Sequence, residues 1–374
     1  MKNKSSMRKL ITYLFVFALI LTSSNLFGQV KFSNDFLAIG VGARAQGMGN
    51  AQVSIANDLT SGYWNPAGLT EIQSPLQVGA MHAEWFGSVA NYDFISIAKP
   101  LDQEKKSVVG LTVIRLGIDN IPNTINLVDK DGTINYDNIT EFSAADYAVL
   151  LSYARQIKMK DRTLSIGGNT KIIRRVIGSF ANAWGFGLDF GLQYNIKDKW
   201  RFGLMARDVT STFNAWNFSF TDREKEVFTI TDNDIPDNSI EITRPRFILG
   251  GAYTARFSKE LSLTTAIDLD FTTDGQRNVL VSSKAFNMDP HLGLELDYKG
   301  FIYVRGGLSN FQQVLDDVDG TKKEWDMQPH FGIGIVLGRF TIDYAQSNIG
   351  NVGVTQASNL FSLKIDFKQK KKGA

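Results

Sequence analysis

The sequence contains no cysteine among its 374 residues, only three histidines and only eight prolines. Without cysteine there can be no disulfide scaffold, no thiolate metal site and no catalytic thiol. The mean hydropathy of −0.12 is too low for a bundle of membrane-spanning helices. A hydrophobic content of 43% is in turn too high for a disordered chain. What remains is a large folded protein, rich in glycine and in aromatic side chains.

Charge is nearly balanced over the sequence, with a formal net charge of +2, and gives no reason to expect a nucleic-acid partner. At the N-terminus, four basic residues precede a short apolar run at residues 10–21, and a small, polar stretch follows. This order is typical of a secretory signal peptide, which we place at residues 1–28. An uncleaved anchor helix is the alternative, but the apolar run falls short of the roughly 20 residues that a span needs.

Apolar and polar residues alternate along most of the remaining chain, and this period of two predicts β-strands. The last such segment places Phe361, Leu363 and Ile365 on one face, with Ser362 and Lys364 on the other. The pattern predicts fourteen strands, at residues 76–85, 89–99, 106–119, 143–157, 162–178, 183–195, 199–209, 243–257, 260–272, 288–298, 301–310, 327–337, 339–346 and 359–368.

Soluble β-sandwiches also alternate, so the connections are needed to distinguish the two classes of fold. Every second connection is a short turn, and several of the others are long, such as 120–142 and 210–242. Short turns at one end and long loops at the other are typical of an outer-membrane barrel with an even strand number and both termini in the periplasm. We therefore predict an all-β transmembrane barrel of about 14 antiparallel strands at residues 76–368, followed by a basic periplasmic tail at residues 369–374.

The apolar faces of such a barrel contact outer-membrane lipid, and the charged faces must then point into the lumen. An arginine or lysine on the lipid face at mid-bilayer costs about 2 to 4 kcal/mol. Both signs of charge occur on the polar faces, so we expect a luminal network of paired charges. Its expected members are Arg201, Arg207, Lys364, Asp268, Asp270, Asp189, Glu295, Asp343 and Asp366.

Residues 29–75 do not alternate and are rich in glycine. Gly40, Gly42 and Ala45 resemble a dinucleotide-binding fingerprint, but no βαβ unit surrounds them, so no cofactor is expected. Asn65 followed by Pro66 predicts an N-cap and the first residue of a short helix. A compact piece without strands that precedes a barrel is most simply a hatch or plug in the lumen, where its backbone finds polar partners.

Two runs in this segment carry a family resemblance. Gly-Ala-Arg-Ala-x-Gly-Met-Gly at residues 42–49 and Tyr-Trp-Asn-Pro-Ala-Gly-Leu at residues 63–69 resemble the N-terminal segment of the PorV/PorQ family, a Bacteroidota branch related to the FadL-type fatty-acid channels. The resemblance implies a fourteen-stranded outer-membrane barrel with a luminal hatch, and no enzymatic activity. The hatch motif consists of Gly42, Arg44, Gly47, Gly49, Asn65, Pro66 and Ala67.

The same resemblance implies a role in type IX protein secretion. Members of the family bind the C-terminal signal domain of a cargo protein, or a component of the surface attachment machinery, and work beside the secretion translocon. The candidate partner-binding loop is 210–242, which carries Phe213, Trp216, Phe218 and Phe220. An equally weighted interpretation places these aromatic side chains over the barrel mouth or in the interfacial girdle.

The alternative function is FadL-like transport of hydrophobic small molecules. This function requires an apolar path past the hatch and a kink or gap in the wall. Glycine pairs such as Gly167-Gly168 or Gly306-Gly307 are candidates for that gap, although such pairs more often mark tight packing or a bend.

A barrel enzyme is a third possibility, but the residues give it little support. His82, His291 and His330 fall on separate strands, and no nucleophile and base lie together in the local sequence. The runs at 129–132 and 317–320 resemble the start of a calcium loop but lack its downstream glutamate, so no metal site is expected.

Overall fold

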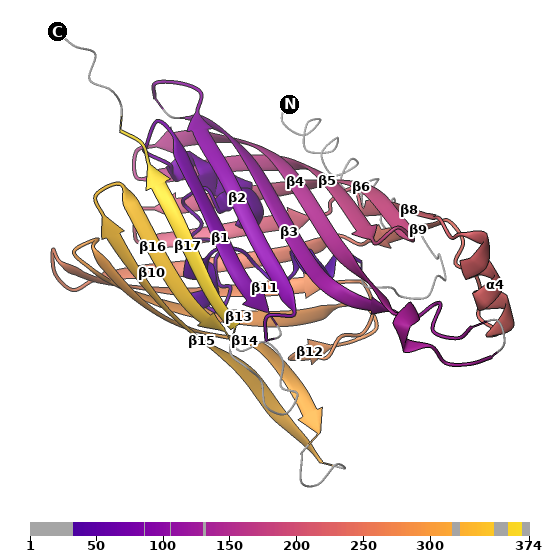
Figure 1. Ribbon diagram of the computed structural model, residues 1–374. Helices are drawn as coiled ribbons and strands as arrows, with labels where there is room; N and C mark the ends of the chain where they lie inside the picture. Colours follow the sequence, from indigo (N-terminus) through magenta and orange to yellow (C-terminus); the bar gives the residue numbers. More distant parts are fainter. Residues whose placement is uncertain are drawn as a thin grey trace, which may run out of the picture. The chain divides into compact units, whose positions relative to one another are not determined.

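Antiparallel strands that follow one another along the chain pair into a closed barrel of fourteen strands (Figure 1). The structure is a computed structural model and describes residues 33–85, 87–104, 106–129, 132–315, 322–347 and 358–368. The expected signal peptide and basic tail lie outside these residues. Among the helices in the described ranges, none is long and apolar enough to span a membrane.

Each of the fourteen predicted strands is present, with ends that differ by a few residues. The barrel closes where β1 pairs with β17, from Gln77 opposite Asp366 to Glu84 opposite Asn359. The wall consists of β1 (Gln77–Trp85), β2 (Ala90–Pro100), β3 (Ser107–Asn123), β4 (Thr140–Met159), β5 (Arg162–Ile177), β6 (Ala181–Ile196), β7 (Trp200–Arg207), β10 (Arg246–Arg256), β11 (Leu261–Thr272), β13 (Asn287–Tyr298), β14 (Ile302–Leu315), β15 (Lys323–Leu337), β16 (Phe340–Ser347) and β17 (Ser358–Asp366).

The prediction of a loop at 210–242 was wrong in part. β8 (Thr212–Phe218) pairs with the first residues of β6, directly above β7, and β9 (Ser239–Thr243) pairs with β8. The wall therefore continues through this segment, with only a short interruption between β7 and β8. Beyond β8, helix α4 (Asp222–Ile230) begins with a capping box formed by Thr221 and Glu224.

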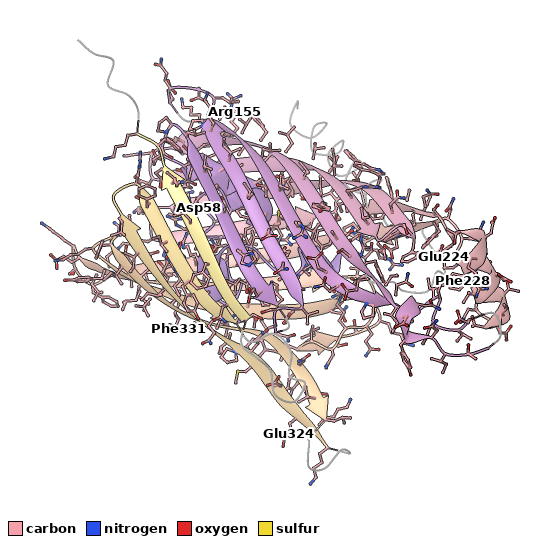
Figure 2. The ribbon with its side chains drawn as sticks, in the orientation of Figure 1. Asp58, Arg155, Glu224, Phe228, Glu324 and Phe331 are labelled. Carbon is pink, nitrogen blue, oxygen red and sulfur yellow. The ribbon has the colours of Figure 1, made fainter. Side chains whose placement is uncertain are left out.

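Two short elements complete the long connections. β12 (Val281–Ser282) pairs with the start of β13, and η3 (Tyr136–Asn138) is a single 3-10 turn between β3 and β4. Figure 2 shows Glu224 and Phe228 of α4, together with Glu324 of β15, at the opposite end from Arg155, which precedes the short turn between β4 and β5. We call these two ends the long-connection end and the short-turn end.

The two faces of the wall are as the alternation predicted. Phe361 and Leu363 of β17 face outward and are 57% and 42% exposed, whereas the side chain of Leu360, which faces the lumen, is fully buried. The expected luminal charges lie on the inward face, where Asp189, Asp268, Asp270 and Glu295 are among the buried residues. Lipid on one side and protein on the other impose this division on every strand.

Residues 33–76, here called the N-terminal segment, pack against the inward face of the strands (Figure 1). The segment contains η1 (Asp35–Leu37), α2 (Ala43–Gly47), α3 (Ser61–Trp64) and η2 (Pro66–Glu71). The main apolar core forms between this segment and the wall, and its largest fully buried side chains include Trp85, Tyr92, Phe94, Leu69 and Leu360.

The N-terminal segment crosses the lumen from one end of the barrel to the other. Ser33 Oγ donates to Glu241 Oε2 at 3.2 Å and Asn34 Nδ2 donates to Thr243 Oγ1 at 2.8 Å, both near the long-connection end. The segment then leads into β1 at the short-turn end, where β17 also ends. The first described residue and the end of β17 therefore lie toward opposite ends of the barrel, whereas the termini themselves lie outside the described residues, so their predicted periplasmic position stays a prediction.

Candidate functional site

A chain of ion pairs fixes the N-terminal segment to the wall. Arg44 of α2 donates from Nε and Nη2 to the two carboxylate oxygens of Glu295, at 2.8 and 2.9 Å. Arg305 Nε donates to the same carboxylate at 2.7 Å, and Arg305 Nη1 donates to Asp343 at 2.7 Å. Glu295 thus joins two arginines, one from the segment and one from β14, which satisfies the buried carboxylate.

Two motif glycines allow the backbone of the segment to touch the wall. A Cβ added to Gly47 would lie 2.9 Å from Gly332 Cα of β15, and one added to Gly49 would lie 2.7 Å from Leu308 N of β14. Gly49 also has a positive φ of 61°, which disfavours other residues. Nearby, Gly42 N–H donates to Met81 Sδ at 2.9 Å. These glycines therefore serve close packing inside the barrel.

The Asn65-Pro66-Ala67 run binds the opposite side of the wall. Asn65 caps η2, as predicted, by accepting from Ala67 N–H at 3.2 Å. Its amide nitrogen also donates to the carbonyls of Val53 and Leu192, both at 2.9 Å. Because one side chain bonds to the segment and to β6, it fixes their relative position.

Asp58 forms a third attachment, on the side of β17. Its carboxylate accepts from Thr60 Oγ1 at 2.6 Å and lies 3.4 Å from Lys364 Nζ. Burial alone would raise the pKa of Asp58, but the positive charges of Lys364 and Arg44 and the bonds from Thr60 outweigh it, so the pKa is lowered below its ordinary value.

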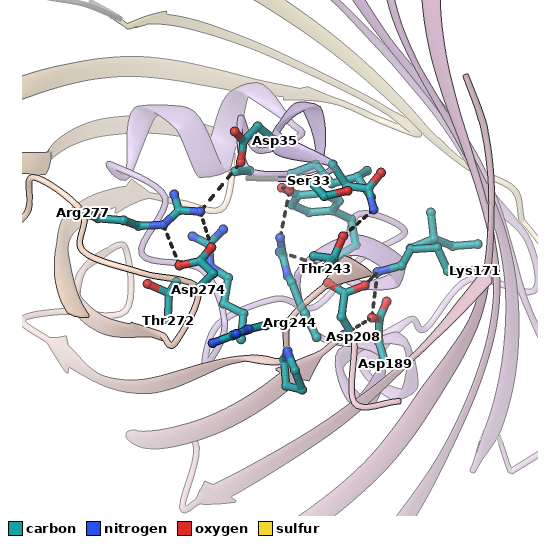
Figure 3. A pocket seen from close by; sticks show the side chains of 18 residues that line it. Ser33, Asp35, Lys171, Asp189, Asp208, Thr243, Arg244, Thr272, Asp274 and Arg277 are labelled. Atoms are coloured by element: carbon teal, nitrogen blue, oxygen red, sulfur yellow. Dashed lines mark hydrogen bonds and ion pairs between the residues drawn. The ribbon is translucent and has the colours of Figure 1, made fainter. Parts of the chain in front are cut away.

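A polar pocket lies between the start of the segment and the wall near the long-connection end (Figure 3). On one side of it, Lys171 pairs with Asp189 at 3.0 Å and with Asp208 at 2.6 Å. On the other side, Arg277 pairs with Asp274, 2.5 Å away, and approaches Asp35. Neutralised charges line the pocket, so it does not offer an apolar ligand a site.

The luminal cavities are small. The pocket of Figure 3 has a volume of about 50 Å³, and two further cavities, beside Trp64 and beside Asp58, have volumes of about 20 and 30 Å³. Sites for small organic ligands usually measure about 300 to 1,000 Å³. In this conformation the segment therefore fills the lumen at these places.

The aromatic candidates for partner binding fall on both faces of the wall. Phe213 of β8 faces outward and is 47% exposed. Trp216 faces the lumen, where its Nε1 donates to Glu241 at 3.1 Å and its ring lies 5.0 Å from the Arg175 guanidinium. Phe218 stacks at 6.0 Å on Trp216, and Phe220 stacks at 6.3 Å on Phe218. The structure therefore separates Phe213 from the other three, which form a continuous row at the mouth.

The glycine pairs proposed as a possible gap instead divide between the two faces. Gly167 packs against Pro66 and Ala67, with 2.5 Å between Ala67 N and an added Cβ, and Gly307 packs against Gly49. Gly306 faces outward, and an added Cβ there would meet nothing within 4 Å. The inward member of each pair therefore accommodates the N-terminal segment.

The ladder between β13 and β14 nevertheless breaks off close to Gly307. Pairing runs from Tyr298 opposite Ile302 to Leu292 opposite Leu308 and stops there. Beyond this point β14 continues only with β15, through a bulge between Ser309 and Gln312. Pro290 in β13 has no N–H to donate to a neighbour, which helps to explain why pairing ends.

The connection between β11 and β13 bridges the far side of this break. Asn278 Nδ2 donates to the carbonyl of Gln313 at 2.7 Å, and Gln313 N–H donates back to Asn278 Oδ1 at 3.1 Å. Between these bonds and the Leu292–Leu308 pair, no β13–β14 ladder bond is formed among the described residues. We call this unpaired stretch, residues 289–291 and 309–312, the wall gap.

The N-terminal segment reaches the wall gap from inside. The ring nitrogen Nδ1 of His291 lies 2.9 Å from the carbonyl oxygen of Gly49. On the other edge, Ser309 Oγ lies 2.7 Å from His330 Nε2, and Ser347 Oγ lies 2.9 Å from His330 Nδ1. Local sequence does not indicate that these two serines contact a histidine, because all three residues lie on different strands. In the part of the chain that the structure describes, His330 bonds to two hydroxyls without the carboxylate that a catalytic triad requires.

An apolar groove on the outer face begins at the same place. Leu292 and Leu308, the last pair of the ladder, lie at one end of it, and its volume is about 750 Å³. Gly251 and Gly306 form part of its floor, since neither has a side chain. The other large side chains around it are Trp200, Phe202, Tyr253, Ile267 and Leu294.

No metal centre accompanies these features in the described ranges, since no group of three or more His, Asp or Glu side chains there could hold an ion. The candidate site is therefore a break in the wall, closed on the inside by residues 48–49 and open on the outside to an apolar groove. Pro290 was the signal in the sequence, because it falls within a strand that otherwise alternates.

No family model and no curated protein matches this sequence. Solved structures do share its fold. The toluene transporter TbuX of Ralstonia pickettii aligns with a TM-score of 0.53, 12% identity and coverage of 88% of this chain and 98% of that one. The toluene transporter TodX of Pseudomonas putida aligns with a TM-score of 0.54 and 12% identity, over 88% of this chain and 98% of TodX. The CymD monoaromatic hydrocarbon channel aligns with a TM-score of 0.55 and 12% identity, over 91% of this chain and 100% of CymD. The chain is thus similar in fold to FadL-type outer-membrane barrels.

Proposed function

We propose that this chain passes small hydrophobic molecules across the outer membrane and exchanges them with the bilayer through the wall gap. Structures with the same fold include two toluene transporters and a channel for monoaromatic hydrocarbons, which supports this class of substrate. The proposal favours the transport alternative over the secretion role that the N-terminal motif implies.

The observation that carries the proposal is the position of the wall gap beside the apolar groove. When a hydrophobic molecule leaves the lumen for water, exposure of its apolar surface costs about 25 cal/mol per Å² of free energy. Release through the wall avoids that loss, because the groove at Leu292 and Leu308 receives the molecule among apolar side chains.

Passage requires the N-terminal segment to move, and we propose that it acts as a hatch. Gly49 and Met48 lie directly behind Gly307 and Gly293, so they block the inner side of the wall gap. The contact between His291 and the Gly49 carbonyl joins this turn to the edge of the wall gap. A shift of this turn away from the wall would connect the groove to the lumen.

Cross-linking across the wall gap tests the proposal. The Phe311 N–H bonds to the Asp289 carboxylate, so the two residues approach each other across the gap. Because the chain has no native cysteine, Asp289→Cys with Phe311→Cys can be joined selectively by a short bifunctional methanethiosulfonate. Uptake of labelled toluene by cells that carry the variant should fall to the rate of cells without the protein, and reduction should restore it.

The matched control is Leu296→Cys with Val304→Cys, which places the same cross-link between paired residues of the same two strands. Uptake through this variant should equal that of the unmodified protein. Wild-type uptake no faster than that of cells lacking the chain would contradict transport itself. Full uptake through the cross-linked gap would instead place the exit elsewhere.

A second candidate function is the binding of a protein partner at the long-connection end, as expected for a type IX secretion component. Exposed apolar side chains there favour it: Tyr136, Ile230 and Ile240 are 72%, 71% and 70% exposed. Deleting residues 219–237 removes α4 but leaves β8 in the wall. Co-purification of protein partners should then be lost while the barrel still assembles, and partners retained by this variant would exclude α4 as their site.

A further inference from the structure

A row of polar side chains crosses the outer face of four neighbouring strands, β1 to β4. The strand register places His82 opposite Asp93, Asp93 opposite Arg115, and Arg115 opposite Tyr147. We call these four residues the outer row. Such groups are rare on a lipid-facing surface, where ionisable residues usually mark a function.

The side chains of the outer row point toward the membrane. Ile95 and Val113, two residues along the same face of β2 and β3, are 60% and 37% exposed. Phe94 and Ile114, which alternate with them and face the lumen, are 1% and 0% exposed. The strand period of two therefore places Asp93 and Arg115 on the lipid side.

The outer row marks the border of the apolar belt near the long-connection end. The next outward residues toward that end form a second polar row, in which Glu84 pairs with both Asn91 and Asn359. Toward the short-turn end, only Ile95 and Ile97 face outward on β2 before Lys99, a span of about 20 Å along the strand at ~3.3 Å per residue. Strands of such barrels tilt by about 35 to 45°, so this stretch covers about 15 Å of an apolar band that is about 25 Å tall. Because the next outward residues beyond the row are polar, we place the row at the border of the band on the side of the long-connection end.

Hydrogen bonds hold the charges of the outer row in place. Asp93 contacts His82 Nδ1 with one oxygen at 2.8 Å and accepts from Arg115 Nη1 with the other at 3.1 Å. Arg115 also bonds to Tyr147, and its guanidinium lies over Gly117, toward the long-connection end. A guanidinium has five N–H donors, so these two bonds leave donors for a further acceptor.

The register extends the row with another cation. Tyr147 lies opposite Arg174 of β5, and Arg174 lies opposite Trp184 of β6, with the guanidinium 4.8 Å from the indole ring. The extended row thus carries the guanidinium charges of Arg115 and Arg174 against the single carboxylate of Asp93, and the carboxylate of Glu84 belongs to the next row. Its excess of positive charge suits an anionic group.

An apolar groove adjoins the outer row on the side of the bilayer interior. Its volume is about 700 Å³. His82, Asp93, Arg115 and Tyr147 border it, and its apolar lining is formed by Ala80, Ile95, Val113, Ile342, Phe361 and Leu363. A cationic rim above an apolar groove matches a molecule with an anionic head and hydrocarbon chains.

We propose that the outer row and this groove bind a phosphorylated, multiply acylated glycolipid of the outer leaflet, of the lipid A class. Its phosphate accepts hydrogen bonds from Arg115 and His82, and one of its acyl chains occupies the groove. Arg115 serves this purpose better than lysine would, because its planar fork bonds to two phosphate oxygens at once. The site lies across β1 to β4, away from the wall gap, so it does not depend on the transport proposal.

Lipid A binding to the purified full-length barrel in detergent tests the inference. The dissociation constant is measured for wild type, Arg115→Gln and Arg155→Gln. Arg155 is an outward-facing arginine of the neighbouring β4, near the short-turn end (Figure 2), so its variant matches the change in charge. Because Arg115→Gln loses a charge-assisted hydrogen bond to the phosphate, its dissociation constant should rise roughly tenfold or more. The dissociation constant of Arg155→Gln should equal that of wild type.

Two further measurements separate the parts of the site. Ala80→Phe fills the groove without changing the charges and should also weaken the binding of lipid A. Lipid A without phosphates should bind to the wild-type protein no more tightly than intact lipid A binds to Arg115→Gln. Folded protein is confirmed for each variant by heat-dependent gel migration. Equal affinity of Arg115→Gln and wild type would overturn the inference. Equally tight binding of phosphatidylglycerol would overturn the assignment to a glycolipid.

Discussion

Arg44 of the N-terminal segment and Glu295 of β13 form a bidentate ion pair inside the barrel, in which Arg44 Nε and Nη2 lie 2.8 and 2.9 Å from the two carboxylate oxygens. Since Glu295 also accepts from Arg305, Arg44→Gln leaves the carboxylate with one partner. The segment should lose about 1 to 3 kcal/mol of attachment, while the barrel stays folded.

Ion conductance of single barrels in a planar bilayer checks this prediction. Arg44→Gln should open more often than wild type, because the segment leaves the wall more readily. Arg155→Gln, which changes the same charge on the outer face, should behave as wild type. Unchanged opening of Arg44→Gln would show that the ion pair does not retain the segment.

Gly306 and Gly307 are neighbours in sequence with opposite surroundings. An added methyl group at Gly307 would meet Gly49 of the segment, whereas one at Gly306 would meet nothing within 4 Å. Gly307→Ala should therefore displace the turn at residues 48–49 and raise toluene uptake, and Gly306→Ala should leave it unchanged. Labelled uptake measures both. A silent Gly307→Ala would argue against close packing at this point.

The lipid face can be tested at adjacent residues of β17. Leu363→Arg places a charge among lipid chains at a cost of about 2 to 4 kcal/mol and should deplete folded barrel from the membrane. Lys364→Leu changes an inward residue and puts no charge among lipid chains, and Asp58 keeps the bonds from Thr60 and the nearby charge of Arg44, so the depletion should be far milder. The folded fraction on gels compares them, and equal depletion by both variants would contradict the assignment of faces.

Acid should release the N-terminal segment near Asp58. Its pKa is lowered in the folded protein, so its contribution to stability is complete above the ordinary value of about 4 and is lost as the pH falls through the lowered pKa. Protection of the amides of residues 56–60 against hydrogen exchange, taken relative to the intrinsic exchange rate at each pH, should therefore fall below about pH 4. Asp58→Asn should exchange faster at neutral pH and show less change with acid, and an identical acid response in this variant would assign the effect to another group.

The strands could be predicted because the membrane imposes one rule on all of them. Lipid outside and packed protein inside give each strand a strict period of two, which is visible in local sequence. The interruption between β7 and β8 concealed the continuation of the wall, since Asp208 and Ser211 adopt positive φ angles of 54° and 57° and end the alternation. Beyond them, the outward positions of Phe213 and Ala215 resume it.

The site was harder to predict because it depends on pairing between distant residues. Nothing local shows that Leu292–Leu308 is the last pair of its ladder, or that Asn278 bridges to Gln313. The glycine motif did indicate a special backbone, but only the fold shows that Gly49 contacts β14 behind the wall gap. His82 likewise contacts Asp93 only because β1 and β2 pair in this register.

The order of the elements constrains how the protein is made. The N-terminal segment precedes β1, and β1 completes the barrel only by pairing with β17, the last strand of the chain. The residues synthesised first therefore pack against a wall whose seam closes only when the last strand has been made. Assembly of this protein should accordingly be slow, because its closing contact joins the two ends of the described chain.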